Sequence, residues 1–244
     1  MVAEAVGRVA PVRWMAAASL VVAAGLLAGC APRGGQRPSA PPPAASPQPA
    51  PPAGATVFDV DPAHSEVTVL VRRSGPLARL GHNHVLTSGQ ESGIAWLGDD
   101  LRHSGFELRL PVADFVVDDP GARTAAGAEF PGEVPEEARD GTYRNMLRPE
   151  VLDAARYPRI VVQSSGLGGT WERPVAYASV TLRAITRELA IPIAIERDGH
   201  SILARGSLRI RQSDFGMAPF SVGGGAIQVA DEVEILFEIR AVAR

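Results

Sequence analysis

Apolar residues recur at every second position in several stretches after residue 57. In 106–112, phenylalanine, leucine and valine alternate with glutamate, arginine and proline, and similar patterns occupy 189–196 and 232–239. Because successive side chains of a strand point to opposite faces, each stretch has one apolar face and one mainly polar face. The pattern predicts antiparallel strands around a core. Further strands are expected over 66–72, 93–97, 159–165, 177–184 and 202–211.

Turn signals separate these strands and one interval has helical character. Clusters rich in glycine and aspartate predict turns at 98–100, 166–169, 198–199 and 223–225. The helical interval is expected between Phe130 and Pro158. Within it, Pro149 suits the first position of a helix, Glu150 places an acidic residue in the first turn, and Pro158 ends the segment.

The number of strands predicts the fold class. About eight strands with one short helical insertion indicate an all-β protein, an antiparallel lipocalin-like barrel. An eight-stranded barrel has an interior that either packs solid or holds one slender ligand. An immunoglobulin-like sandwich is the alternative, but no cysteine pair supports it.

Composition excludes several classes of function. Hydrophobic residues make up 45% of the chain and charged residues 21%, as expected for a protein with one real core. The net charge of −3 provides no basic field to hold nucleic acid, so no nucleic-acid partner is expected. The sequence contains no lysine, which excludes Schiff-base and P-loop lysine chemistry.

The N-terminal region has the features of an export signal. Arg8 and Arg13 precede an apolar run over 14–29, and the single cysteine of the chain, Cys30, follows it. The ending Leu-Ala-Gly-Cys resembles the bacterial lipobox, which implies cleavage before Cys30 and diacylation of its thiol. An uncleaved anchor helix and an ordinary signal with an incidental cysteine are the alternatives.

A segment rich in proline and alanine follows the cysteine. Residues 31–56 have almost no large apolar side chain and predict an extended, disordered tether. We therefore divide the chain into a signal peptide (1–29), the lipidated Cys30 with its tether (30–56) and a barrel domain (57–244). The protein is expected to be exported and anchored through its lipid to the bacterial envelope. That site is the outer membrane and periplasm in a two-membrane cell, and otherwise the outer face of the cell membrane.

The domain resembles a known family in five blocks of sequence. They are FDVDPAHS (58–65), NMLRPEVLDAARYPRI (145–160), VTLRAITREL (180–189), QSDFG (212–216) and VADEV (229–233). In this order they resemble the YceI-like, polyisoprenoid-binding domain family. The resemblance implies an extended, lipocalin-like barrel whose interior holds a long isoprenoid chain. The chain departs from that pattern at Gly81-His-Asn-His84, where family members often have a single histidine, and so looks like a separate branch.

The apolar faces of the predicted strands are the candidate ligand cavity. Such faces bind an apolar chain by excluding water, at about 25 cal/mol for each Å² removed from solvent. A plain packed core is the alternative, and the family resemblance favours a cavity. The candidate cavity residues are Phe106, Leu108, Leu110, Leu189, Ile191, Ile193, Ile195, Val233, Ile235 and Phe237.

A cluster of basic residues is the candidate site for the ligand's head group. Arg72, Arg73 and Arg79 could clamp a phosphate or pyrophosphate, and His82 or His84 could add a hydrogen-bond donor. A solvated, charged loop is the plain alternative.

The two histidines are also a candidate metal site. In an extended strand His82 and His84 would share one face, and such a pair suits zinc, copper or nickel. A third ligand would have to come from elsewhere in the chain; the candidates are His64, His103, Asp61 and Asp231.

These observations favour a binding protein over an enzyme. No set of residues forms a catalytic constellation, so we expect non-catalytic binding or transport of an isoprenoid or similar long-chain amphipathic lipid in the envelope. No cofactor is required, and the expected partners are that lipid and the membrane, reached through Cys30. One alternative is a histidine-based metal-binding or redox- or stress-related factor of the envelope with no lipid ligand. The other is a purely structural or stress-protective domain with a solid barrel.

Overall fold

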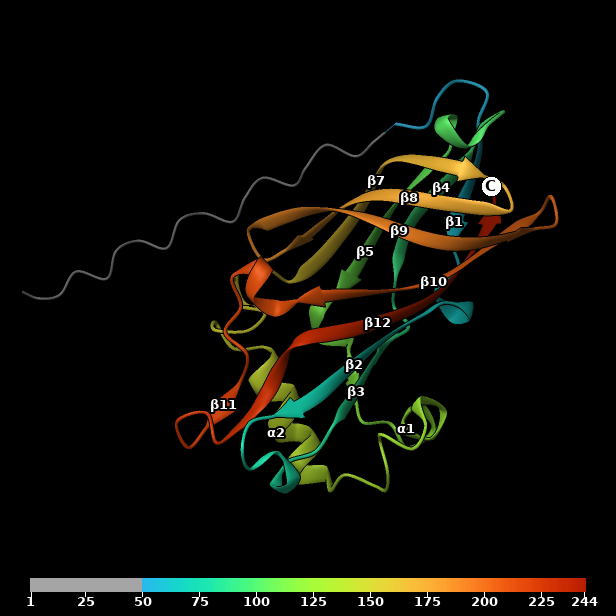
Figure 1. Cartoon of the computed structure of the whole chain (residues 1–244). Helices are drawn as coiled ribbons and strands as arrows, with labels where there is room; N and C mark the ends of the chain where they lie inside the picture. The colour runs from blue at the N-terminus through green and yellow to red at the C-terminus, as the bar shows by residue number, and fades with distance from the viewer. Residues whose placement is uncertain (1–49) are drawn as a thin grey trace, which may run out of the picture. The chain divides into compact units, whose positions relative to one another are not determined.

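A computed structural model describes residues 50–244. The predicted signal peptide, Cys30 and most of the tether therefore lie outside the described residues. The strands are β1 (Thr56–Val60), β2 (Glu66–Ser74), β3 (His84–Ser88), β4 (Ser92–Leu97), β5 (Gly105–Pro111), β6 (Val116–Val117), β7 (Arg159–Thr170), β8 (Arg173–Leu182), β9 (Ile185–Arg197), β10 (Ser201–Arg211), β11 (Ser221–Val222) and β12 (Ile227–Ala243), and the α-helices are α1 (Pro120–Ala126) and α2 (Glu136–Met146) (Figure 1).

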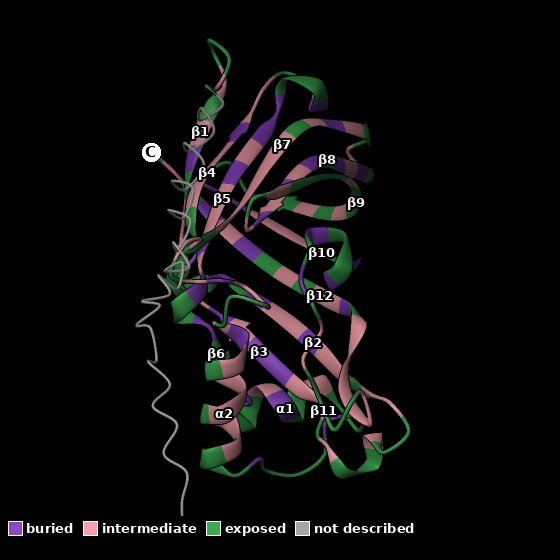
Figure 2. Ribbon diagram, turned by 90° about the vertical axis from the view of Figure 1, so that its left-hand side faces the viewer, coloured by how far each residue is buried: buried purple, intermediate pink, exposed green. Residues whose placement is uncertain are grey.

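The strands form a closed antiparallel barrel. Eight of them follow the ring order β1–β4–β5–β7–β8–β9–β10–β12, and pairing between β12 and β1 closes the ring. Buried residues alternate with half-buried or exposed ones along β8, as Figure 2 shows. The period-two pattern therefore reports the inner and outer faces of a barrel, and the predicted all-β, lipocalin-like fold class is confirmed.

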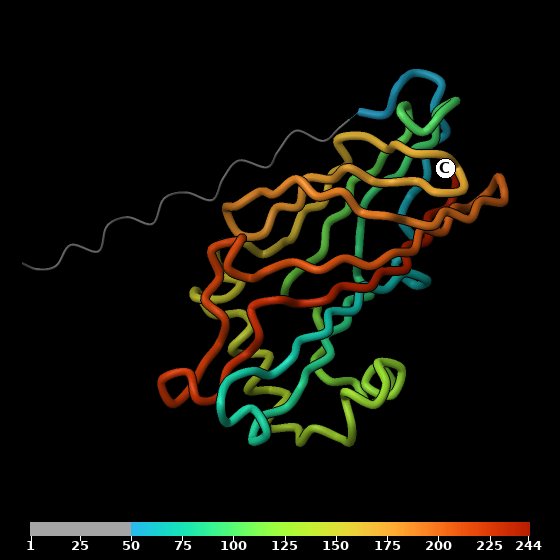
Figure 3. The backbone as a smooth tube through the Cα atoms, viewed as in Figure 1, coloured from blue at the N-terminus to red at the C-terminus, as the bar shows by residue number. Residues whose placement is uncertain are grey.

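Three strands of the barrel are interrupted, and their second halves extend it in one direction. β1 and β2 pair with successive parts of β12, so they are two halves of one strand. In the same way, β4 pairs with β1 and β3 pairs with β2. Next to them, β5 pairs with β4 and β6 pairs with β3. The extension β2–β3–β6 lies beyond the closed ring, beside the lower half of β12 (Figure 3).

The break between β1 and β2 is a single 3-10 turn over Pro62–His64. Asp61 caps it, because its Oδ1 accepts a hydrogen bond from the Ala63 amide at 3.1 Å. Ser65 restores the lost connection to β12: its Oγ donates to the carbonyl of Asp61 at 2.7 Å and accepts from the amide of Arg240 at 3.0 Å. The strand can therefore bend without leaving its backbone groups unpaired.

α2 covers the place where the extension and the ring separate. β7 begins at Arg159, opposite Pro111, and does not continue beside β6. α2 contacts β6 there, and Met146 at its end packs in a buried cluster with Leu110 and Phe115. None of the helices in residues 50–244 is long and apolar enough to cross a membrane.

The helical predictions were partly wrong. α2 lies within the expected interval but ends at Met146, and the residues from Pro149 to Arg156 form irregular turns. α1 was not predicted, although it begins with the same signal, a proline at its first position. The difference is the cap: Asp119 precedes Pro120 and its Oδ1 accepts from the Ala122 amide at 3.0 Å, whereas the residue before Pro149 is an arginine.

One predicted turn was also wrong. The glycine-rich segment 166–169 lies inside β7 and pairs with β8, after a register shift between Ser164 and Gly166. The chain instead turns at 171–172, where β7 and β8 are joined. Glycine here marks a bulge in a strand, a role that its sequence signal does not distinguish from a turn.

Core packing yields a prediction for stability. The β ladders and buried clusters all lie within residues 56–244, so a fragment starting at Ala50 contains the complete barrel and we expect it to fold by itself. Phe215 is 1% exposed and packs among Val180, Leu182 and Ile210. Phe215→Ala should lower the free energy of unfolding by about 3–5 kcal/mol in urea titrations.

The control for this prediction is Tyr177→Ala. Tyr177 is 47% exposed on the outer surface of β8, so its replacement should change the free energy of unfolding by less than about 1 kcal/mol. Equal losses in the two variants would show that Phe215 is not part of the core.

Candidate functional site

An apolar cavity of about 370 Å³ occupies the interior of the barrel. Its wall is made by inward-facing side chains of the ring strands, of β2 and β3, and of α2. Nine of the candidate cavity residues line it: Phe106, Leu108, Leu110, Ile191, Ile193, Ile195, Val233, Ile235 and Phe237.

Leu189 is the exception among those candidates. It does not line the cavity and packs instead against the clusters that contain Phe215 and Ile191. The 3-10 turn Gln212–Phe215 contacts β9 and supplies Phe215 to that packing. The period of β9 predicts that Leu189 faces inward, but it cannot predict which neighbour fills the space.

The cavity is polar at one end only. Apart from the indole of Trp96, its polar lining consists of His84, Thr142, Asn145 and Gln212. Strand register places His84 opposite Val71, Val71 opposite Val233, and Val233 opposite Ile210, two residues before Gln212. His84 and Gln212 therefore stand at the same level of the barrel, at the extended end.

Some of the polar side chains at this end have a hydrogen-bond partner in the protein, and one has none among the described residues. The Thr142 hydroxyl donates to the Ala138 carbonyl at 3.0 Å, and the Gln212 amide donates to the Ala230 carbonyl at 2.8 Å. The half-buried amide of Asn145 has no hydrogen-bond partner among the described residues. A half-buried amide without a partner is a ready contact for a polar group of a ligand.

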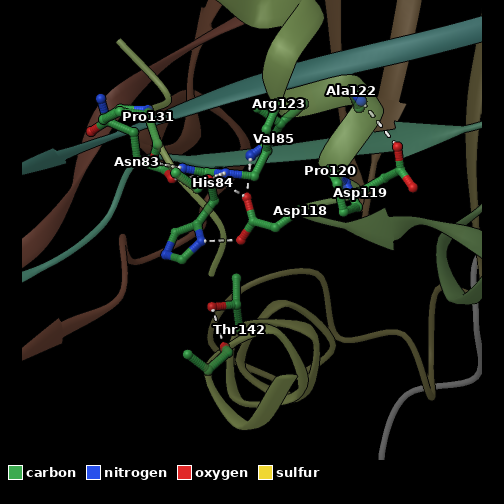
Figure 4. A network of polar contacts seen from close by, with 12 residues as sticks. Asn83, His84, Val85, Asp118, Asp119, Pro120, Ala122, Arg123, Pro131 and Thr142 are labelled. Carbon is green, nitrogen blue, oxygen red and sulfur yellow. Dashed lines mark hydrogen bonds and ion pairs between the residues drawn. The ribbon is translucent and has the colours of Figure 1, made fainter. Parts of the chain in front are cut away.

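A buried ionic network orients His84 (Figure 4). Asp118 Oδ2 lies 2.6 Å from His84 Nδ1, while Asp118 Oδ1 accepts from the Val85 amide at 2.9 Å and from Arg123 Nη1 at 2.6 Å. The side chains of Asp118 and Arg123 are 0% and 4% exposed. Because Asp118 holds Nδ1 of the ring, Nε2 of His84 is the nitrogen left for the cavity.

Arg123 is held on all sides by carbonyl groups as well as by Asp118. Its Nη1 donates to the Asn83 carbonyl at 2.8 Å, its Nε to Gly132 at 3.1 Å and its Nη2 to Pro131 at 3.1 Å. This guanidinium therefore connects α1, the segment before β3 and the segment before α2. Neither Asp118 nor Arg123 belongs to a recognisable motif, and sequence analysis did not select them.

The network determines the charge of Asp118. Burial by itself would raise the pKa of this carboxyl group. The hydrogen bonds from His84 and the Val85 amide, the charge of His84 and the bond from Arg123 outweigh burial and hold the pKa below its usual 3.8. Asp118 is therefore ionised at neutral pH and compensates the buried charge of Arg123.

The candidate head-group arginines lie outside the cavity. Arg72 is paired with two carboxylates, Glu129 at 2.8 Å and Glu234 at 3.1 Å. Arg73 donates from Nη1 to the carbonyl of Gly81 at 2.6 Å, and Arg79 is exposed. None of the three lines the cavity. The structure therefore brings only His84, of the five candidates, to the cavity wall.

The histidine pair is not a strand pair. β3 begins at His84, so the alternation rule does not apply to His82, which is exposed in the irregular segment before it. The two ring centroids are 6.3 Å apart. The proposed third ligands do not join them: His64 pairs with Asp61, His103 with Asp100, and Asp231 binds Ser213. Within residues 50–244 there is no group of three or more potential metal ligands.

A closed all-β barrel with an apolar interior cavity defines the structural class of lipocalin-like barrels. Within that class, the family model of the YceI-like domain matches residues 58–241. The chain therefore belongs to the YceI-like family. None of the curated proteins matches the sequence.

Two solved structures are similar in fold. BcnA of Burkholderia cenocepacia is 18% identical, with a TM-score of 0.56, and the match covers 75% of this chain and 100% of that one. A polyisoprenoid binding domain of Saccharophagus degradans, implicated in plant cell wall breakdown, is 10% identical, with a TM-score of 0.51 and coverage of 78% and 99%.

The network yields a prediction that depends on pH. Asp118→Asn removes the charge opposite buried Arg123 and should lower the free energy of unfolding at pH 7 by about 3–5 kcal/mol. Because the pKa of Asp118 is lowered in the fold, its stabilisation is present above the unfolded pKa and is lost as the pH falls through the folded one. The difference between the two proteins should therefore shrink below a pH of about 3.9.

The measurement is urea unfolding at a series of pH values, with Asp114→Asn as the control. Asp114 is exposed at the end of the 3-10 turn that follows β5, and its loss should have little effect at any pH. A constant difference between wild type and Asp118→Asn from neutral to acid pH would contradict the assignment.

Proposed function

We propose that the protein binds one long-chain amphipathic lipid, an isoprenoid or a molecule of similar shape, inside its barrel and performs no chemistry on it. The observation that carries this proposal is the division of the cavity into a long apolar wall and one polar end. Such a site suits a molecule with a hydrocarbon chain and a single polar terminus.

Hydrophobic burial supplies the affinity in this proposal. The lining consists almost wholly of aliphatic and aromatic side chains, and each CH₂ group moved from water to such a surface contributes about 0.8 kcal/mol. A chain of several isoprene units can therefore offset the cost of being ordered. The barrel backbone is fully paired around the ring, so the apolar wall is present before the ligand arrives.

The polar end favours an uncharged terminus. Thr142, Asn145 and Gln212 are neutral hydrogen-bonding groups, and His84 presents one ring nitrogen. A pyrophosphate would place multiple negative charges where the cavity wall has no guanidinium, and Asp118 lies directly behind His84. A hydroxyl or carbonyl group matches these donors and acceptors. These four side chains therefore take the place of the arginine clamp that the sequence predicted.

Family and fold are consistent with the proposal. The YceI-like domain covers residues 58–241, and one structure of similar fold is of a polyisoprenoid binding domain. The sequence of the N-terminal region supports a location for this activity: a lipobox at Cys30 and a proline-rich tether would hold the barrel at the envelope, outside the cytoplasm. In that setting the protein would store or transfer its lipid.

The first test is occupancy of the barrel. The fragment from Ala50 should be purified without detergent after export and extracted with organic solvent, and the extract analysed by mass spectrometry. Ala204 lines the cavity on β10, so Ala204→Phe should fill part of it and lower lipid occupancy at least about tenfold.

The matched control is Ala194→Phe. Ala194 pairs with Arg205 on the neighbouring strand and is exposed on the outside of the barrel. Its lipid occupancy should equal that of the wild type. A wild-type barrel that repeatedly yields no lipid, or equal occupancy in the two variants, would contradict the proposal.

The polar end has its own test. Asn145→Leu removes an amide that has no partner in the protein, so we expect little change in stability. Its affinity for a long-chain prenol should fall about tenfold, while its affinity for a hydrocarbon of equal length should stay the same or rise. Titration calorimetry with both probes measures this difference. Equal losses for prenol and hydrocarbon would show that Asn145 does not contact the polar terminus.

A further inference from the structure

Two loops stand together at the polar end of the cavity. The β2–β3 loop (75–83) contacts the β11–β12 hairpin (221–228), because Leu77 donates its amide to the carbonyl of Ala226 at 2.8 Å. Gly81 also lies close to the side chain of Ile227. Figure 3 shows both segments at the same end of the barrel. We call the two segments together the loop tip.

The loop tip exposes large apolar side chains. Leu80 is 62% exposed, Val222 45% and Leu77 39%, and these are three of the seven exposed large apolar residues in 50–244. The other four are spread singly over strands: Val116, Tyr177, Leu236 and Val242. Large apolar side chains that gather at one tip and are exposed to water indicate a surface that another molecule covers when the protein functions.

The charge of the loop tip and of the residues that flank it is wholly positive. Residues 73–84 and 215–230 contain no aspartate or glutamate, whereas the chain as a whole has a net charge of −3. The side chain of Arg73 donates only to a backbone carbonyl, that of Gly81, and Arg79 has no hydrogen bond or ion pair to any described residue. The nearby carboxylate of Glu129 is already paired with Arg72. A surface of exposed leucine and uncompensated arginine matches an anionic lipid layer.

The loop tip is continuous with the cavity. Phe220 and Val229, at the base of the hairpin, line the cavity and are joined by a hydrogen bond of 2.9 Å from Val229 N to Phe220 O. His84, directly after the β2–β3 loop, lines it as well. The hairpin turn, residues 223–226, contains Gly223, Gly224 and Gly225, all with positive φ, a conformation that favours glycine.

We propose that the loop tip docks on the surface of an anionic phospholipid bilayer, with Leu77, Leu80 and Val222 inserted among the lipids. Arg79 and the neighbouring Arg73, at the end of β2, then lie beside the lipid phosphates. This inference deepens the proposed function, because it places the polar end of the cavity against the membrane from which an amphiphile would enter or to which it would return.

The test is sedimentation of the fragment from Ala50 with two kinds of vesicle. One kind is pure phosphatidylcholine and the other contains roughly one third phosphatidylglycerol. We expect binding to the anionic vesicles that weakens as salt is added. The double variant Leu77→Ser, Leu80→Ser should bind at least about tenfold more weakly. Leu236→Ser is the matched control, since Leu236 has the same exposure of 39% as Leu77 but lies on the barrel wall.

A charge variant keeps the proposal testable if the double variant fails to fold. Arg79→Glu changes an exposed side chain without a partner and should weaken binding to the anionic vesicles alone. Arg187→Glu, on the exposed outer face of β9, should leave binding unchanged. Three results would each overturn the proposal. The first is equal binding by all variants, and the second is no binding to either kind of vesicle. The third is light scattering that shows the leucine changes to act by dissociating a dimer.

The two proposals fail separately. A barrel that yields stoichiometric lipid on extraction but ignores vesicles refutes docking and leaves the carrier function standing. An empty barrel that binds anionic vesicles through Leu80 and Arg79 supports docking and refutes the carrier function.

Discussion

The continuity of β12 is the constraint on which the rest of the structure depends. Its 17 residues pair with β10 along one edge and with β1 and then β2 along the other. Because one strand holds both halves of the interrupted neighbour in register, the ring and its extension share a single interior. Side chains from Ala241 to Val229 along β12 line one cavity, and its length follows from the length of that strand.

The interruptions in the strands make one end of the cavity polar and leave the rest apolar. Where β6 and β7 separate, strand pairing cannot complete the wall, and α2 with the 3-10 turn at Gln212 supplies it instead. These segments bring side-chain amides and a hydroxyl that an inward strand face lacks. Behind the wall, Asp118 and Arg123 neutralise each other, and Asp118 orients His84 toward the cavity.

Local sequence signals were reliable where the neighbours of a residue along the chain decide its conformation. The alternation in 106–112 and 232–239 identified β5 and β12 because the side chains of these two strands that line the cavity are apolar. Proline signals were less reliable: Pro120 starts a helix because Asp119 caps it, while Pro149 has no such residue before it. The glycines of 166–169 were also an unreliable signal, because a bulge and a turn require the same backbone freedom.

The sequence by itself determined the barrel class, the family and the apolar character of the interior, because these follow from period-two patterning and from ordered blocks of residues. The tertiary structure alone decided which polar groups meet. Asp118 lies 34 residues from His84 along the chain, and Gln212, Asn145 and His84 come together only when the barrel closes. It also decided that Arg72 is neutralised by Glu129 and Glu234 and is not free to hold a ligand. Charge along a sequence can be counted, but its compensation depends on distance in space.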